Sequence, residues 1–403
     1  MRYKLFKLAG LFLRLGLIVI FLSAFLACQL ETASLREGSA QTGGGTSART
    51  VYATGFASAG EGVYTAVLWK NGIPSVLPVP EDAVYSGAYH IALASGTIYV
   101  GGFFAQFIGE NIVKTPALWK IPISGTSIHR QDLPLPPGFS PQEMPIGGIF
   151  VSQGKVYVAA NLFNETMNAS RGGFWIATDP TNPGPFLIEP PEGPEGYTAT
   201  SAGFGLWVEG ETRYMPGNIY TEADFHPALW INETLHLLPI PEGGSSGETY
   251  KIFLSSGYAF IAGSYRLGES TLPCYWRVSL NDFSATVTTL GGTPPNSESL
   301  AVDIHINETN VYIGGGIGFE GQDGWRPTYW KNGQPIPISL PPGLEIGIIT
   351  CLTVQDSLLY LAGYFGDPEG IGSEAFVYRG ATKISHNPPT GFSSAQIFGL
   401  AVD

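Results

Sequence analysis

The chain has 403 residues, and 20 Lys and Arg against 33 Asp and Glu give it a formal net charge of −13. This acidic balance argues against nucleic acid as a partner, because a phosphate backbone is bound mainly through cationic side chains. Hydrophobic residues make up 44% of the chain, whereas only three cysteines occur. We therefore expect an apolar core, rather than a disulfide framework, to hold the fold together.

The start of the chain is organised like an export signal. Arg2, Lys4 and Lys7 form a charged beginning, and thirteen mainly apolar residues from Leu15 to Ala27 are too few for a comfortable membrane span. We therefore interpret residues 1–27 as a signal peptide that is removed from the mature chain.

The signal ends in Phe25-Leu26-Ala27-Cys28, which resembles the lipobox of bacterial lipoprotein precursors. The resemblance implies that Cys28 is lipidated and becomes the N-terminus after cleavage. It predicts an exported protein of the cell envelope, attached by its lipid to the outer or the cytoplasmic membrane on the extracytoplasmic side. An ordinary secretory signal with a coincidental cysteine is the alternative interpretation.

We interpret residues 28–48 as the lipidated cysteine followed by a flexible tether, because Gly, Ser and Thr dominate this stretch. Such a linker reaches roughly 25 Å. The folded part is expected at 49–403. No later segment approaches about 18 uninterrupted apolar residues, so membrane contact is predicted through the lipid alone. We interpret Cys274 and Cys351 as buried free thiols, with a disulfide between them as the alternative.

A pattern of aromatic, aliphatic, small and Gly residues recurs along the chain. It is clearest at Tyr99–Gly102, Phe260–Gly263, Tyr312–Gly315 and Tyr360–Gly363, with weaker copies starting at Tyr52, Tyr157 and Tyr214. A second aromatic follows each copy by 16 to 20 residues, and these are Trp69, Trp119, Trp175, Trp230, Trp276, Trp330 and Tyr378. Seven units of 46 to 58 residues, each with several short strands, are typical of propellers. The Trp series is interpreted as packing between units.

The folded chain begins at a second strand, 49–56, and stops after a first strand, 395–402, so pairing the two ends completes one unit. The sequence therefore predicts an all-β, seven-bladed β-propeller of four-stranded antiparallel blades, closed by its N- and C-terminal strands. The Tyr-aliphatic-Gly-Gly strand resembles that of kelch propellers, although Trp in a Leu-Trp-Lys strand departs from their pattern. This resemblance implies architecture only, because propellers host enzymes, adhesins and scaffolds.

Charge is expected to concentrate on one face of this ring. Residues 1–27 carry four basic and no acidic residues, so removing them changes the net charge from −13 to −17. In antiparallel blades, the loops from second to third strand and from one blade to the next lie on the same face. These loops carry twenty acidic against four basic residues, whereas the opposite face carries seven of each.

The acidic loops are our candidate binding surface, with solubility as the alternative explanation of their charge. The candidate binding residues are Glu81, Asp82, Glu143, Glu192, Glu242, Glu298, Glu345 and Trp325. The loops also carry aromatic residues that we expect to be exposed, namely Phe104, Phe107, Tyr220, Tyr265, Phe319, Trp325 and Phe365. Carboxylates among aromatic rings suit a basic protein surface or a glycan.

Two smaller groups of residues are candidates for chemistry. Glu222, Asp224 and His226 share one loop and could bind calcium, with a solvated turn as the alternative. No other cofactor is predicted. His90 and His305 fall near innermost strands, where they could line the central channel as acid or base or serve as structural histidines.

We therefore expect a non-catalytic binding or scaffold module whose partner is an envelope or extracellular protein, or a glycan. The alternative is a propeller enzyme that cleaves glycans with loop carboxylates or calcium. The two readings differ in geometry: catalytic carboxyls of a glycosidase lie roughly 5 to 9.5 Å apart across a cleft, whereas a docking face spreads its carboxylates round the ring.

Overall fold

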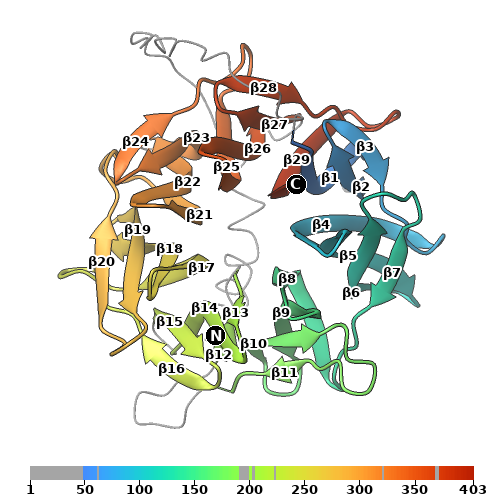
Figure 1. Cartoon of the computed structure of the whole chain (residues 1–403), viewed down its shortest axis with the longest axis horizontal. Coiled ribbons are helices and arrows are strands. Elements are labelled where there is room, and N and C mark those ends of the chain that lie inside the picture. The colour runs from blue at the N-terminus through green and yellow to red at the C-terminus, as the bar shows by residue number, and fades with distance from the viewer. Residues whose placement is uncertain are drawn as a thin grey trace, which may run out of the picture.

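The computed structural model describes residues 49–60, 63–189, 199–201, 205–221, 224–319, 322–367 and 372–403. Their strands form seven antiparallel sheets arranged as a ring (Figure 1). These ranges contain strands, turns and bends but no helix, and hence no helix able to cross a membrane. The predicted seven-bladed β-propeller is confirmed. The predicted signal peptide, Cys28 and the tether lie outside the described residues.

Each blade is named here by its order round the ring, with its strands given from the axis outward. Blade 1 contains β29 (Ser394–Val402), β1 (Val51–Gly60), β2 (Val63–Lys70) and β3 (Ile73–Val76). Blade 2 contains β4 (Ala83–Ala94), β5 (Thr97–Ile108), β6 (Asn111–Pro122) and β7 (His129–Asp132). Blade 3 contains β8 (Phe139–Ser152), β9 (Lys155–Asn164), β10 (Ala169–Ile176) and β11 (Phe186–Leu187).

The remaining blades follow the same order, with one irregularity in blade 4. There β12 (Ala199–Ser201) and β13 (Trp207–Glu209) both pair with β14 (Thr212–Tyr220), which is followed by β15 (Phe225–Ile231) and β16 (Thr234–Leu237). Blade 5 contains β17 (Gly247–Ser255), β18 (Tyr258–Leu267), β19 (Ser270–Ser279) and β20 (Ala285–Thr289). Blade 6 contains β21 (Leu300–Asn307), β22 (Asn310–Phe319), β23 (Gln322–Lys331) and β24 (Gln334–Pro337). Blade 7 contains β25 (Ile346–Gln355), β26 (Leu358–Gly366), β27 (Ser373–Arg379) and β28 (Thr382–Ser385).

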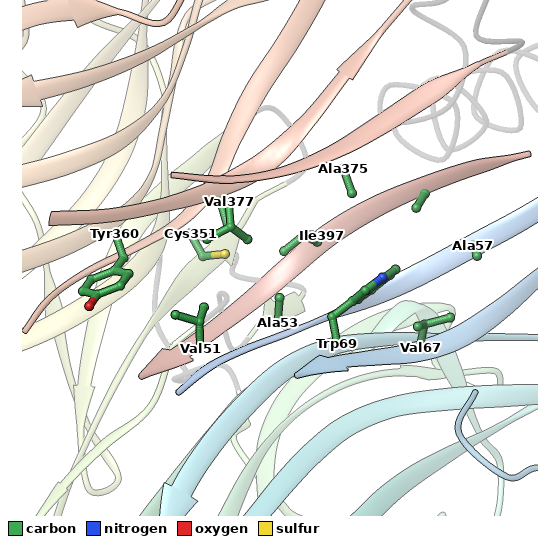
Figure 2. Packing of buried hydrophobic residues seen from close by; sticks show 12 residues of the cluster. Val51, Ala53, Ala57, Val67, Trp69, Cys351, Tyr360, Ala375, Val377 and Ile397 are labelled. Atoms are coloured by element: carbon green, nitrogen blue, oxygen red, sulfur yellow. The ribbon is translucent and has the colours of Figure 1, made fainter. Parts of the chain in front are cut away.

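Blade 1 is assembled from both ends of the chain. Strand β29 pairs with β1 from Val51 opposite Val402 to Ser58 opposite Ser394, so the red and blue ends lie side by side in Figure 1. The sheet packs on blade 7 through buried apolar residues that include Trp69 and Cys351 (Figure 2). The closing blade is therefore held by the pairing between β29 and β1 and by its apolar contacts with blade 7.

The recurring glycine of the sequence pattern has a steric cause. A Cβ atom on Gly102, Gly263, Gly315 or Gly363 would overlap a carbonyl oxygen of the innermost strand of the same blade. In each of these blades the register between the first and second strands shifts next to that carbonyl. A β-bulge in the innermost strand thus presses its backbone against the second strand, and only glycine leaves the space.

The Trp series lies between blades, as predicted. All six residues from Trp69 to Trp330 are at most 1% exposed. The indole Nε1 of Trp119 donates to the carbonyl of Pro78 at 2.8 Å, and that of Trp276 donates to Pro239 at 2.7 Å. Trp69, Trp175 and Trp330 donate in the same way to Asn387, Pro134 and Gly291. Each bond joins a blade to the exit of the blade before it, that is, to the segment that follows the outermost strand of that blade. Cys274 and Cys351 are buried free thiols, also as predicted.

Replacing one of these indoles should therefore weaken the junction between two blades. We expect Trp119→Phe to lower the free energy of unfolding by about 2 to 4 kcal/mol, because the substitution leaves a cavity and a buried carbonyl without a donor. Urea unfolding followed by circular dichroism measures the change. Tyr378→Phe is the matched control, because the half-buried Tyr378 takes the Trp position in blade 7 and no hydrogen bond of its hydroxyl is found among the described residues. It should change stability by less than about 1 kcal/mol. Equal losses in both variants would contradict this role for the indole N–H.

Candidate functional site

Two sets of loops share one face of the ring, as the strand order requires: those from second to third strand and those from one blade to the next. We use the name acidic face for the surface formed by these two sets of loops and by the ends of the strands that they join. Glu81, Glu242, Glu298 and Glu345 are exposed and lie in four different blade connections. None of the four forms an ion pair or a side-chain hydrogen bond within the part of the chain that the structure describes. These carboxylates are therefore spread round the ring and do not converge on one cleft.

The other candidate binding residues have mixed positions. Asp82 is exposed and accepts a hydrogen bond from Gln106 Nε2 at 2.6 Å. Trp325 lies in β23 and is partly buried. Glu143 lies in β8, but its side chain is outside the described residues, as is the whole of Glu192. The structure thus leaves five exposed acidic candidates on this face.

Exposed apolar side chains also lie on the acidic face, and of these the sequence analysis expected only Phe107. They lie at or beside the hairpin tips between second and third strands, and they are Val63, Phe107, Ile108, Ile112, Met167 and Leu267. Phe107 and Ile108 are 58% and 63% exposed and come from the long β5–β6 hairpin of blade 2. Phe107 pairs with Ile112 across this hairpin, and exposed apolar side chains that cluster in this way are typical of contact surfaces.

Three of the aromatic residues expected to be exposed are buried. Phe104 and Phe365 are 2% and 0% exposed, and Tyr265 is 4% exposed. The strands that carry them extend farther than expected, so these residues lie within ladders and point inward. Phe365 stacks on Phe376 with ring centroids 4.3 Å apart. Of the others, Phe107 is exposed, while Tyr220, Phe319 and Trp325 are partly buried.

The candidate calcium loop is described only in part, because Glu222 lies outside the described residues. Asp224 is exposed and forms a turn in which its backbone N–H donates to Thr221 Oγ1 at 2.9 Å. His226 lies in β15, where it pairs with Ile219. Among the residues described, no group of three His, Cys, Asp or Glu side chains is placed to hold a metal ion.

Glu248 and Glu298 form a carboxylate pair where blades 5 and 6 meet on the acidic face. Burial raises the pKa of Glu248, a hydrogen bond from Tyr250 Oη to its Oε2 at 2.8 Å opposes this shift, and the charge of Glu298 adds to it. Burial also raises the pKa of Tyr250, so the phenol stays a donor. The pair thus contains one carboxyl whose pKa is raised and a second carboxyl that is exposed.

A cavity of about 220 Å³ lies where the innermost strands meet, lined by residues of all seven blades. His90 and His305, predicted to lie near the axis, both line it. Lys251 and Asp303 also line it and were not singled out from the sequence. They occur once each rather than once per repeat, so the sequence periodicity could not reveal them. The inner-strand bulges next to Thr249 and Ala301 turn them toward the axis.

The polar groups of this cavity come from different blades. Asp303 accepts hydrogen bonds from the backbone N–H groups of Ile304 at 2.9 Å and Leu352 at 2.7 Å. Burial raises the pKa of Asp303, while the charge of Lys251 and these two bonds oppose the shift. Burial also raises the pKa of the neighbouring Cys351 thiol, and the charge of Asp303 raises it further.

Both histidines of the cavity are neutral at physiological pH. Burial lowers the pKa of His90 to about 3, aided by the charge of Lys251 and opposed by a hydrogen bond to the backbone of Ile146. Burial lowers the pKa of His305 to about 4. The Nε2 atom of His90 is buried and has no hydrogen-bond partner among the described residues.

One half of the cavity has an aromatic wall. Phe150, Trp207, Phe253 and His305 follow one another on consecutive blades, with ring centroids 4.9, 5.0 and 4.5 Å apart. In each blade this position pairs with the recurring aromatic residue of the second strand. It is occupied by Thr353 in blade 7, by Ala401 in blade 1 and by Ala92 in blade 2. At this register position the rings are thus confined to blades 3 to 6.

No family model matches this chain, and no curated protein sequence is similar to it. Apo AztD from Citrobacter koseri is similar in structure, with 14% identity, 88% of this chain and 98% of that chain covered, and a TM-score of 0.39. A GH43 endo-arabinanase from Bacillus licheniformis has 13% identity, with 64% and 99% covered and a TM-score of 0.33. A lectin of Aleuria aurantia in complex with α-methyl-L-fucoside has 10% identity, with 75% and 96% covered and a TM-score of 0.41. These values say nothing about the ligand or activity of this chain.

The two histidines should make stability depend on pH. Their pKa values are about 3 and 4 in the folded protein and about 6.5 in the unfolded chain. At pH values between these limits, the unfolded chain therefore binds more protons than the folded protein. Stability is therefore lost as pH falls through that window. From pH 7 to 4.5 we expect each histidine to remove about 2 kcal/mol.

The double variant His90→Leu/His305→Leu checks this expectation. Urea unfolding of both proteins at several pH values should give the variant a shallower loss of stability on acidification. Carboxylates such as Asp303 titrate in both proteins and cancel in the difference. Parallel curves would mean that neither histidine is buried in its neutral form.

Proposed function

We propose that this protein is an exported, lipid-anchored binding module that docks a basic protein surface of the envelope or the extracellular space on its acidic face, without chemistry. One observation carries the proposal. Exposed carboxylates that form no ion pair within the described residues lie in separate blade connections, with exposed apolar side chains at the hairpin tips between them. Carboxylates steer and select a basic partner, while apolar contacts at the centre of an interface supply much of the affinity.

The position of Arg49 supports the orientation that such a module needs. Arg49, the first described residue, forms an ion pair with Asp356 in the turn between β25 and β26. That turn lies on the face opposite the acidic face, because it joins a first to a second strand. A tether at residues 28–48 would then attach to the opposite face and leave the acidic face directed away from the membrane.

Neutralising the acidic face should abolish docking. We expect Glu81→Gln/Glu242→Gln/Glu298→Gln/Glu345→Gln to lose a specific partner in a crosslinking pull-down from envelope extract, made with full-length protein carrying Cys28→Ser. The partner captured by the parent protein should also be lost at high salt, since screening weakens exposed charge pairs.

The control makes the same change of charge on the opposite face, as Glu209→Gln/Glu211→Gln/Glu233→Gln/Glu308→Gln. All four of these residues are exposed. This variant should capture the partner as the parent does. Equal capture by all three proteins would reject the acidic face as the docking surface.

The Glu248 and Glu298 pair favours a second candidate function, the cleavage of a glycan. A carboxyl with a raised pKa near a second, exposed carboxyl can supply a general acid and a base or nucleophile. On this reading, the parent releases reducing sugar from at least one member of a polysaccharide panel, and Glu248→Gln lowers the rate at least about a hundredfold.

Glu165→Gln is the matched control, because Glu165 is an exposed acid in the β9–β10 loop of the same face. It should retain full activity. A parent protein that cleaves no polysaccharide, or a Glu248→Gln variant that remains as active as the control, would reject the glycan-cleaving function.

A further inference from the structure

We propose that the cavity on the propeller axis is a second binding site, separate from the acidic face, for a polyhydroxylated carboxylate of about monosaccharide size. The cavity is the place where residues of all seven blades meet, and Lys251 and His305 are only partly buried, so solvent reaches it. Three properties of its wall define the ligand: an ammonium group, acceptors for hydroxyl groups, and the faces of aromatic rings.

Lys251 supplies the ammonium group. Lys251 lines the cavity together with His90 of blade 2, Asp303 of blade 6 and Cys351 of blade 7, and its charge acts on all three. Within the described ranges the Lys251 ammonium forms no ion pair. A ligand carboxylate is the group that would complete the bonding of this ammonium.

His90 and Asp303 supply acceptors. The His90 ring is hydrogen-bonded to the backbone of Ile146, and its buried Nε2 has no partner. In a neutral ring that donates through the other nitrogen, Nε2 is an acceptor that needs a donor. The carboxylate oxygens of Asp303 can each accept one further bond. Hydroxyl groups next to the ligand carboxylate would satisfy both side chains.

The aromatic wall supplies apolar ring faces, and the cavity sets the size of the ligand. Trp207 and Phe253 both line the cavity, with ring centroids 5.0 Å apart. The C–H face of a sugar ring or of an extended hydroxy acid packs well on such rings. A cavity of roughly 150 Å³ accommodates benzene, so about 220 Å³ that is open to solvent admits a somewhat larger ligand.

The test is isothermal titration of detergent-solubilised full-length protein with D-glucuronate, and with D-glucose as its uncharged counterpart. We expect D-glucuronate to bind, with D-glucose at least tenfold weaker. Lys251→Met keeps the length of the side chain, removes the charge, and should weaken D-glucuronate binding at least tenfold. Lys155→Met is the matched control, because Lys155 is the exposed first residue of β9, and it should bind like the parent.

A folded state of Lys251→Met is checked by circular dichroism. If this variant does not fold, His90→Phe, which removes the acceptor, and Lys251→Arg, which keeps the charge, replace it: the first should lose binding and the second should keep it. The proposal is overturned if D-glucuronate does not bind at millimolar concentration, if D-glucose binds equally well, or if the charge-removing variant binds like the parent.

The outcome is independent of the proposed docking function. The acidic-face variant with four glutamines should bind D-glucuronate like the parent, and Lys251→Met should capture the protein partner unchanged. Loss of D-glucuronate binding in the acidic-face variant would place the ligand on that face and overturn the cavity site.

Discussion

The hydrogen bond from a buried indole N–H to the backbone carbonyl at a blade exit is the interaction on which this ring depends. The exits at Pro78, Pro134 and Pro239 are formed by residues that lack an N–H group and so end the outermost strand. Their carbonyls then need a donor from elsewhere. The Trp of the following blade supplies it and fills the space between the two sheets, so in five blades one residue both satisfies this carbonyl and joins neighbouring blades.

The inner-strand bulges connect this architecture to the axis. A bulge presses the innermost backbone against the second strand, which explains the recurring glycine, and it also turns the next side chains toward the cavity. The side chain next to the bulge is His90 in blade 2, Lys251 in blade 5 and Asp303 in blade 6. A bulge that is described in six of the blades thus also brings an imidazole and two charges into the interior. The repeat thus creates the place for a site, and departures from the repeat give it chemistry.

The fold could be predicted from the sequence, because it rests on features that repeat. The spacing of Trp69 to Trp330 indicated the number of blades, and the phase of the two ends indicated a strand pair that is observed between β1 and β29. The positions of single side chains were less predictable. Phe104 and Tyr265 were expected in loops because the lengths of β5 and β18 depend on pairing across the sheet, which a local pattern does not fix. The cavity residues come from strands far apart in the chain and become neighbours only when the ring closes.

The pairing of β1 on both edges has a mechanical consequence. A pull on the chain at Arg49, where any anchor upstream would act, runs along β1 rather than across it. Hydrogen bonds to β29 and to β2 lie on either side of that line. They would be loaded together in shear, instead of breaking one after another as in a peeled edge strand. The strand that closes the ring is thus also the strand best placed to carry tension into it.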